Sequence, residues 1–155
     1  MNITLPPPSE NTVTLTAEAQ AFIDAFERCA MPPGSFRHRD HVWLAWLYLR
    51  LYPVPAALAR FVEGLKRFAA SIGQHGLYHE TITYAFFFLI HERMERGGED
   101  SWDAFAACND DLVNGGISFL HAYYPAETLA SDLARKIFLL PEPHSVQPPM
   151  NGEAR

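Results

Sequence analysis

Residues 37–52, RHRDHVWLAWLYLRLY, contain the pattern that decides the fold. On a helical wheel with His41 at zero, apolar side chains lie within roughly 80° of this histidine, whereas Arg39 and Arg50 lie near the opposite pole. The two arginines mark the side that faces solvent, so His41 is expected to point into the core. The pattern predicts an amphipathic helix that stops at Pro53.

Helical spacing of apolar residues continues along most of the chain, and no stretch shows the period-two alternation of a strand with flanking hairpin turns. Further main helices are expected from Thr16 to the turn at 32–34, and over about 55–72, 79–96 and 102–113, with short ones at 117–123, 126–129 and 131–137. The pattern predicts an all-α, compact helical bundle of about five main helices plus short C-terminal helices.

Length and composition indicate one domain. The chain has 155 residues, of which 48% are hydrophobic and 19% charged, enough to bury a core without disulfides. Proline-rich segments predict an extended arm at 1–14 and a tail at 141–155 around a helical domain at 15–140. The two cysteines form no CxxC pair and the N-terminal residues do not resemble a signal peptide, so a cytoplasmic location is expected.

Charge and hydropathy exclude two classes of partner. The net charge is −6 and no basic run exists, which argues against binding to nucleic-acid phosphates. The longest strongly apolar stretch, at 84–90, is too short to span a bilayer. A small-molecule ligand or substrate is the expected partner, and the high aromatic content is compatible with a homodimer.

Histidines supply the candidate site. His38 lies three residues before His41 and about 60° from it on the wheel, so the two imidazoles share the inward face. His79 lies on the apolar face of the 79–96 helix, in its first turn. If the bundle brings the N-terminal ends of both helices together, His38, His41 and His79 form a site of three imidazoles.

Three imidazoles in an apolar surround suit a metal. Neutral imidazole binds zinc, nickel, iron and copper, and three protein ligands with an open position are typical of a catalytic centre. Glu80 is the candidate fourth ligand or general base, and Thr83 and Tyr84 would orient a bound water or substrate. The pattern therefore predicts a divalent transition metal cofactor in a hydrolase or oxidase that acts on a small molecule.

Two other interpretations remain open at this point. An inward histidine is most often hydrogen-bonded to a backbone carbonyl, so the protein is alternatively a non-enzymatic small-molecule-binding or interaction module with structural histidines. In a third interpretation, a histidine acts without metal as a general base. The roles of three further histidines also stay open: His75, His91 and His121.

Two segments resemble a family of small, uncharacterised bacterial proteins. The segment Phe36-Arg37-His38-Arg39-Asp40-His41 fits the pattern F-x-H-x-x-H, and Tyr78-His79-Glu80-Thr81-Ile82-Thr83 fits Y-H-E-T-I-T. The middle element 67–70 and the segment 123–131 are also similar to this family, so the likeness covers about 36–140. The family has no established activity. The resemblance implies the helical fold and the choice of site, while the overall plan also resembles the DinB-like bundles that bind metal through three histidines.

Overall fold

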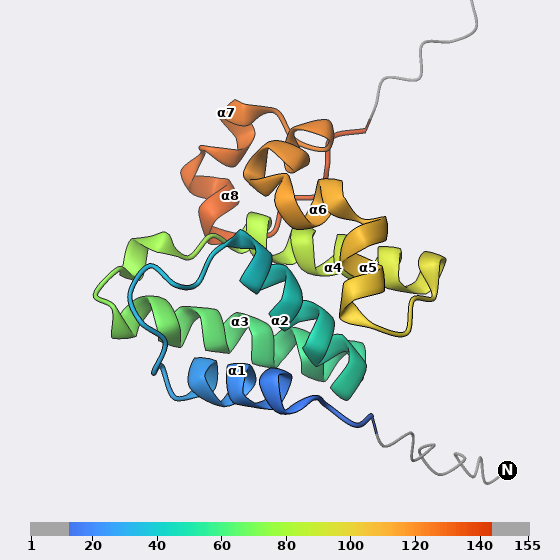
Figure 1. Ribbon diagram of the computed structural model, residues 1–155. Helices are drawn as coiled ribbons and strands as arrows, with labels where there is room; N and C mark the ends of the chain where they lie inside the picture. Colours follow the sequence, from blue (N-terminus) through green and yellow to red (C-terminus); the bar gives the residue numbers. More distant parts are fainter. Residues whose placement is uncertain (1–12, 144–155) are drawn as a thin grey trace, which may run out of the picture.

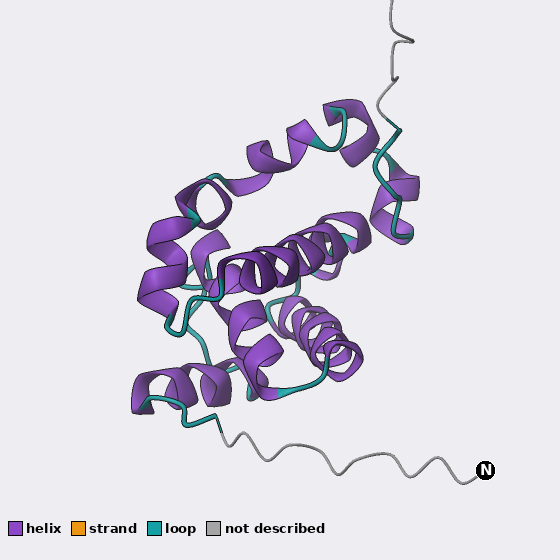
Figure 2. Cartoon of the chain, turned by 90° about the vertical axis from the view of Figure 1, so that its right-hand side faces the viewer, coloured by secondary structure: helices purple, strands orange, loops and turns teal. Residues whose placement is uncertain are grey.

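The computed structural model describes residues 13–143, and all regular structure in that range is helical (Figure 2). In chain order, with η for a 3-10 helix, the elements are α1 (Ala17–Glu27), α2 (His38–Leu51), α3 (Val54–Ser71), η1 (His75–Leu77), α4 (Glu80–Gly97), α5 (Trp102–Cys108), α6 (Asp110–Asn114), η2 (Gly116–Ala122), α7 (Ala126–Leu129) and α8 (Asp132–Lys136). The all-α prediction is confirmed. The predicted arm and tail lie outside the described residues, apart from 13–14 and 141–143.

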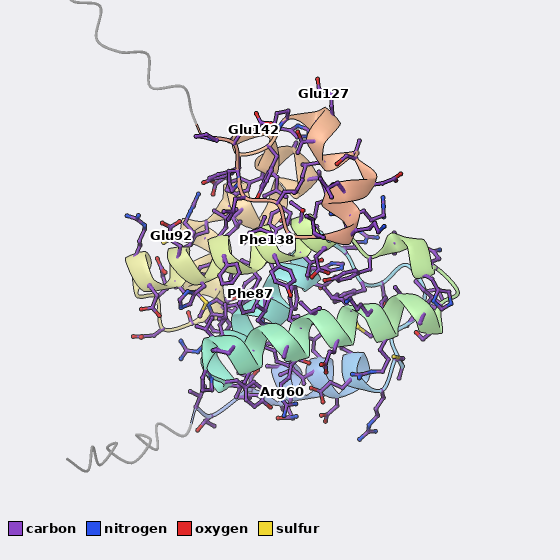
Figure 3. The ribbon with its side chains drawn as sticks, turned by 180° about the vertical axis from the view of Figure 1, so that it is seen from behind. Arg60, Phe87, Glu92, Glu127, Phe138 and Glu142 are labelled. Carbon is purple, nitrogen blue, oxygen red and sulfur yellow. The ribbon has the colours of Figure 1, made fainter. Side chains whose placement is uncertain are left out.

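Helix α2 lies at the centre of the bundle and contacts α3, α4 and α6. Helix α1 packs on α3, and α8 packs on α4, so the two ends of the helical chain cover opposite sides of the bundle (Figure 1). Within the core, Phe87 of α4 points toward α3, where its ring lies 5.8 Å from that of Phe61 (Figure 3). Within residues 13–143, no helix has the length and apolarity needed to cross a membrane.

A glycine allows the close packing of α1 on α3. A Cβ atom built on Gly64 would lie 2.6 Å from the ring of Phe26, a distance that real contacts do not reach. Phe26 is fully buried, and its ring also packs 5.2 Å from Phe36 and 6.0 Å from Phe68. The ring therefore has no free space into which it could retreat, and position 64 requires the smallest residue.

Side-chain caps fix several helix starts at the residues that the sequence indicates. Thr16 accepts a hydrogen bond from the backbone N–H of Ala19 at 3.1 Å, and Ser101 and Ser131 cap α5 and α8 in the same way. At the start of α2, the carboxylate of Asp40 accepts the backbone N–H of Arg37 at 2.8 Å. These bonds satisfy N–H groups that have no partner inside the helix.

The predicted 102–113 helix is interrupted at Asn109, and this part of the prediction is wrong. The side chain of Asn109 donates to the carbonyl of Phe105 at 2.9 Å and accepts from Arg93 of α4 at 2.9 Å. An asparagine amide that bonds local backbone competes with the helical ladder, so its backbone leaves helical geometry, at φ −126° and ψ 41°. The chain turns there from α5 into α6.

The C-terminal segment is tied to the start of α4 by side chains from the Y-H-E-T stretch. The Thr81 hydroxyl donates to the carbonyl of Ile137 at 2.7 Å and accepts the N–H of Leu139 at 3.0 Å. Phe138 lies between Ile137 and Leu139 in the chain, and its ring stacks on that of Tyr84 at 5.4 Å. Figure 3 shows Phe138 against α4. We call the residues 129–139 with their bonds to 76–81 the C-terminal clasp.

Candidate functional site

A cavity of about 470 Å³ lies between the N-terminal half of α2, the C-terminal half of α3 and the N-terminal half of α4. Two large apolar residues of its lining, Leu77 and Ile117, are 61% and 52% exposed. The cavity is lined by Gly34, Phe36, His38, His41, Val42, Phe61, Leu65, Phe68, Ala69, Ile72, Gln74, Leu77, Tyr78, His79, Ile82, Thr83, Phe86, Ile90 and Ile117.

The composition of this lining decides which ligands the cavity accepts. It contains no aspartate, glutamate, lysine or arginine. The wall from α3 is entirely apolar, whereas the polar groups come from the beginning of α2, from Gln74, and from the beginning of α4. All three histidines selected from the sequence line this one cavity, as does Thr83.

Each histidine of α2 uses one ring nitrogen on a backbone carbonyl. His38 donates from Nε2 to the carbonyl of Leu112 at 2.9 Å, and its ring lies 4.8 Å from that of Phe86. His41 donates from Nδ1 to the carbonyl of Arg37 at 2.8 Å. Because a carbonyl can only accept, these bonds fix the tautomer of a neutral ring and leave a lone pair on Nδ1 of His38 and Nε2 of His41.

His79 uses both of its ring nitrogens. It is the N-cap of α4, where Nδ1 accepts the backbone N–H of Ile82 at 3.1 Å. Its Nε2 donates to the carbonyl of Leu129 at 2.7 Å, in the C-terminal clasp. The ring is 8% exposed, and no lone pair remains that could bind a metal.

The donor set therefore does not fit the predicted metal centre. Metal ligation needs a free imidazole lone pair, and the lone pair of His79 is already used to cap α4. Across residues 13–143, no group of three histidine, cysteine or carboxylate side chains is placed to hold an ion. The bundle brings the three histidines to one cavity, but their nitrogens serve the backbone, so the metal cofactor stays a prediction without support from this geometry.

The other residues selected from the sequence occupy different places. Glu80, the first residue of α4, lies outside the cavity lining with its carboxylate 3.9 Å from the ammonium of Lys66. Tyr84 also lies outside the lining, where burial and then the nearby Glu80 raise the pKa of its hydroxyl. The structure thus brings only Thr83 of the three predicted catalytic residues to the cavity.

Burial keeps His41 in its neutral form. Desolvation lowers the pKa of His41 and exceeds the opposing effects of the Arg37 carbonyl and Asp40, while neighbouring His38 lowers it further. The ring of Phe36 lies 4.0 Å from the imidazole. A neutral His41 with its Nδ1 proton held by a carbonyl offers Nε2 as a hydrogen-bond acceptor.

Tyr78 is a functional candidate that sequence reasoning missed. Its side chain lines the cavity, and its buried hydroxyl makes no hydrogen bond of normal geometry among the described residues, although Glu80 and Thr83 lie close to it. Burial, with the nearby Glu80 carboxylate, raises the pKa of Tyr78, so the hydroxyl keeps its proton. A buried hydroxyl without a partner costs free energy that a ligand acceptor would recover. The sequence signal that could identify Tyr78 is its position directly before His79, one of the candidate metal ligands.

Comparisons with known proteins identify no relative on which a function could be based. No protein-family model, no curated protein and no solved structure matches the chain.

Proposed function

We propose that the protein binds a small, uncharged and mostly apolar molecule in the cavity between α2, α3 and α4. The observation that carries this proposal is the lining itself, in which apolar walls surround a few polar groups and no formal charge. Such a concave site with a few convergent polar groups is the usual form of a small-molecule pocket. A charged ligand would lose its hydration without gaining a counter-ion.

The volume limits the size of the ligand. A water molecule occupies about 30 Å³ of liquid, so 470 Å³ corresponds to about 15 non-hydrogen atoms. At roughly 0.5 kcal/mol per atom, within the range observed for small ligands, the binding free energy is about 7 kcal/mol. The expected Kd is therefore on the order of micromolar to tens of micromolar.

A fluorescent probe with a matched pair of variants tests this proposal. The uncharged probe 1-aminoanthracene, whose emission shifts to the blue in apolar surroundings, should bind saturably to the wild-type protein. Ala69→Phe places a ring in the cavity and should weaken binding at least about tenfold, a loss of about 1.4 kcal/mol. Ala70→Phe is the control, because Ala70 is exposed on the same helix and does not line the cavity.

A second variant tests the same prediction in case Ala69→Phe does not fold. Ile117→Trp enlarges an exposed side chain of the cavity lining, so it should not disturb the core. It should also weaken binding of the probe. If both variants keep helical circular dichroism and bind the probe as tightly as wild type, the cavity is not the binding site. If wild type binds no probe at all, the proposal fails.

The location that fits this proposal is a reducing compartment such as the cytoplasm. Both cysteines are free thiols, with Cys29 half-buried and Cys108 exposed. Exposed free thiols are uncommon in proteins of oxidising compartments, which supports this placement.

A further inference from the structure

The polar groups of the cavity carry a more specific inference, which rests on the proposed function. Apart from Gln74, they occur where α2 and α4 begin, whereas the wall from α3 is apolar. His41 offers a lone pair on Nε2, since its Nδ1 proton is donated to the carbonyl of Arg37. The buried hydroxyl of Tyr78 makes no hydrogen bond of normal geometry among the described residues, although Glu80 and Thr83 lie close enough to act on its pKa. The unused hydrogen-bonding capacity of the lining thus includes two acceptors, Nε2 of His41 and Nδ1 of His38, and one donor, the Tyr78 hydroxyl; His41 is the one of the two histidines that burial keeps neutral.

We infer that the ligand carries one uncharged hydroxyl, as an alcohol or a phenol does, which donates to Nε2 of His41. A hydroxyl has one proton to donate and lone pairs with which to accept, so it can also accept from Tyr78. The apolar remainder of the molecule would lie against α3, where Leu65, Phe68 and Ala69 line the wall.

Charged head groups fit this arrangement poorly. A carboxylate would meet the lone pair of neutral His41 and find no cation in the lining, while an ammonium would find no carboxylate. Lys66 and Glu80 lie outside the lining, and their charged groups are 3.9 Å from each other. An ether of the same length can accept but cannot donate, so it isolates the contribution of His41.

Competition against bound 1-aminoanthracene measures this selectivity directly. The competitors are 1-octanol, its methyl ether, octanoate and octylamine, all used near neutral pH. Octanol should displace the probe at about fivefold lower concentration than the ether, since a neutral hydrogen bond contributes a factor of roughly two to twelve. Octanoate and octylamine should be weaker than octanol by at least about tenfold.

Variants of two histidines assign the acceptor. His41→Phe keeps an aromatic ring and removes the lone pair, so octanol and its ether should become equal competitors. His75→Phe is the control, because His75 is exposed on η1 and does not line the cavity. If His41→Phe binds the probe and still prefers octanol over the ether, His41 is not the acceptor and the inference is wrong.

Acidification gives the same information without a substitution. Protonation of His41 converts Nε2 from an acceptor into a donor, so the preference for octanol over its ether should disappear as pH falls through the lowered pKa of His41. The groups that act on His41 in this titration are His38 and Asp40 of α2, while Tyr78 and His79 share the cavity. If the wild type binds the probe but does not distinguish octanol from the ether, the inference fails while the proposed function stands. Failure to bind the probe overturns both.

Discussion

Removal of the His79 imidazole should destabilise the whole protein, because this ring joins α4 to the C-terminal clasp. His79→Ala removes the N-cap of α4, which costs about 1 kcal/mol. It also leaves the buried carbonyl of Leu129 without its donor, which costs about 1–3 kcal/mol. The expected loss is therefore about 2–4 kcal/mol, or roughly 10 °C in Tm for a chain of this length.

Two further variants separate the contributions. Thr16→Ala removes only a cap, from the exposed start of α1, and should cost about 1 kcal/mol. His79→Asn keeps an N-cap acceptor but is too short to reach Leu129, so its cost should lie between those of Thr16→Ala and His79→Ala. The free energy of unfolding in urea, with circular dichroism as the signal, measures all three.

The same experiment distinguishes a structural ring from a metal ligand. If His79→Ala unfolds at the wild-type urea concentration and instead lowers the zinc content of protein purified without a histidine tag, then the assignment of its nitrogens to the backbone is refuted. A large loss of stability with unchanged metal content is the expected result.

Three other changes follow from the packing. Gly64→Ala should cost about 1 kcal/mol in urea unfolding, since overpacking against Phe26 (about 1–3 kcal/mol) exceeds the gain in helix propensity of about 1 kcal/mol. Thr81→Val should cost about 2 kcal/mol, because the Ile137 carbonyl loses its donor, and faster hydrogen exchange in the clasp would check this. Since burial lowers the pKa of His41, the folded chain binds fewer protons than the unfolded chain at acidic pH. The free energy of unfolding should therefore fall as pH drops below the unfolded-state pKa, by at most about 1.4 kcal/mol per pH unit. His41→Phe should lose this part of the pH dependence.

The sequence predicts the helices well because their ends are determined locally. The Ser101 and Ser131 caps lie within three residues of the N–H groups that they satisfy, and the apolar stripe of α2 repeats within one turn. The break at Asn109 is harder to predict because its amide bonds both the nearby Phe105 carbonyl and Arg93, which lies sixteen residues away on another helix. A contact of that kind leaves no periodic signal.

The candidate site was predicted in part. The helical wheels placed His38, His41 and His79 on inward faces, and all three line one cavity, although His79 is the N-cap of α4 and not part of its first turn. The wheel gives the direction of a side chain but not the partner of each nitrogen. The decisive partners of His38 and His79 are the carbonyls of Leu112 and Leu129, at separations of 74 and 50 residues, and backbone carbonyls have no sequence signature.

The C-terminal clasp also constrains the order in which the molecule can be completed. The α4 wall of the cavity is held by Leu129, Ile137 and Leu139, which a ribosome delivers long after α4 itself. A nascent chain that ends before residue 129 can form α1 to α4, but it lacks the partners of His79 and Thr81. The cavity between α2, α3 and α4 should thus be completed late in synthesis, and a chain that stops before residue 129 should form helices without the bonds that fix the start of α4.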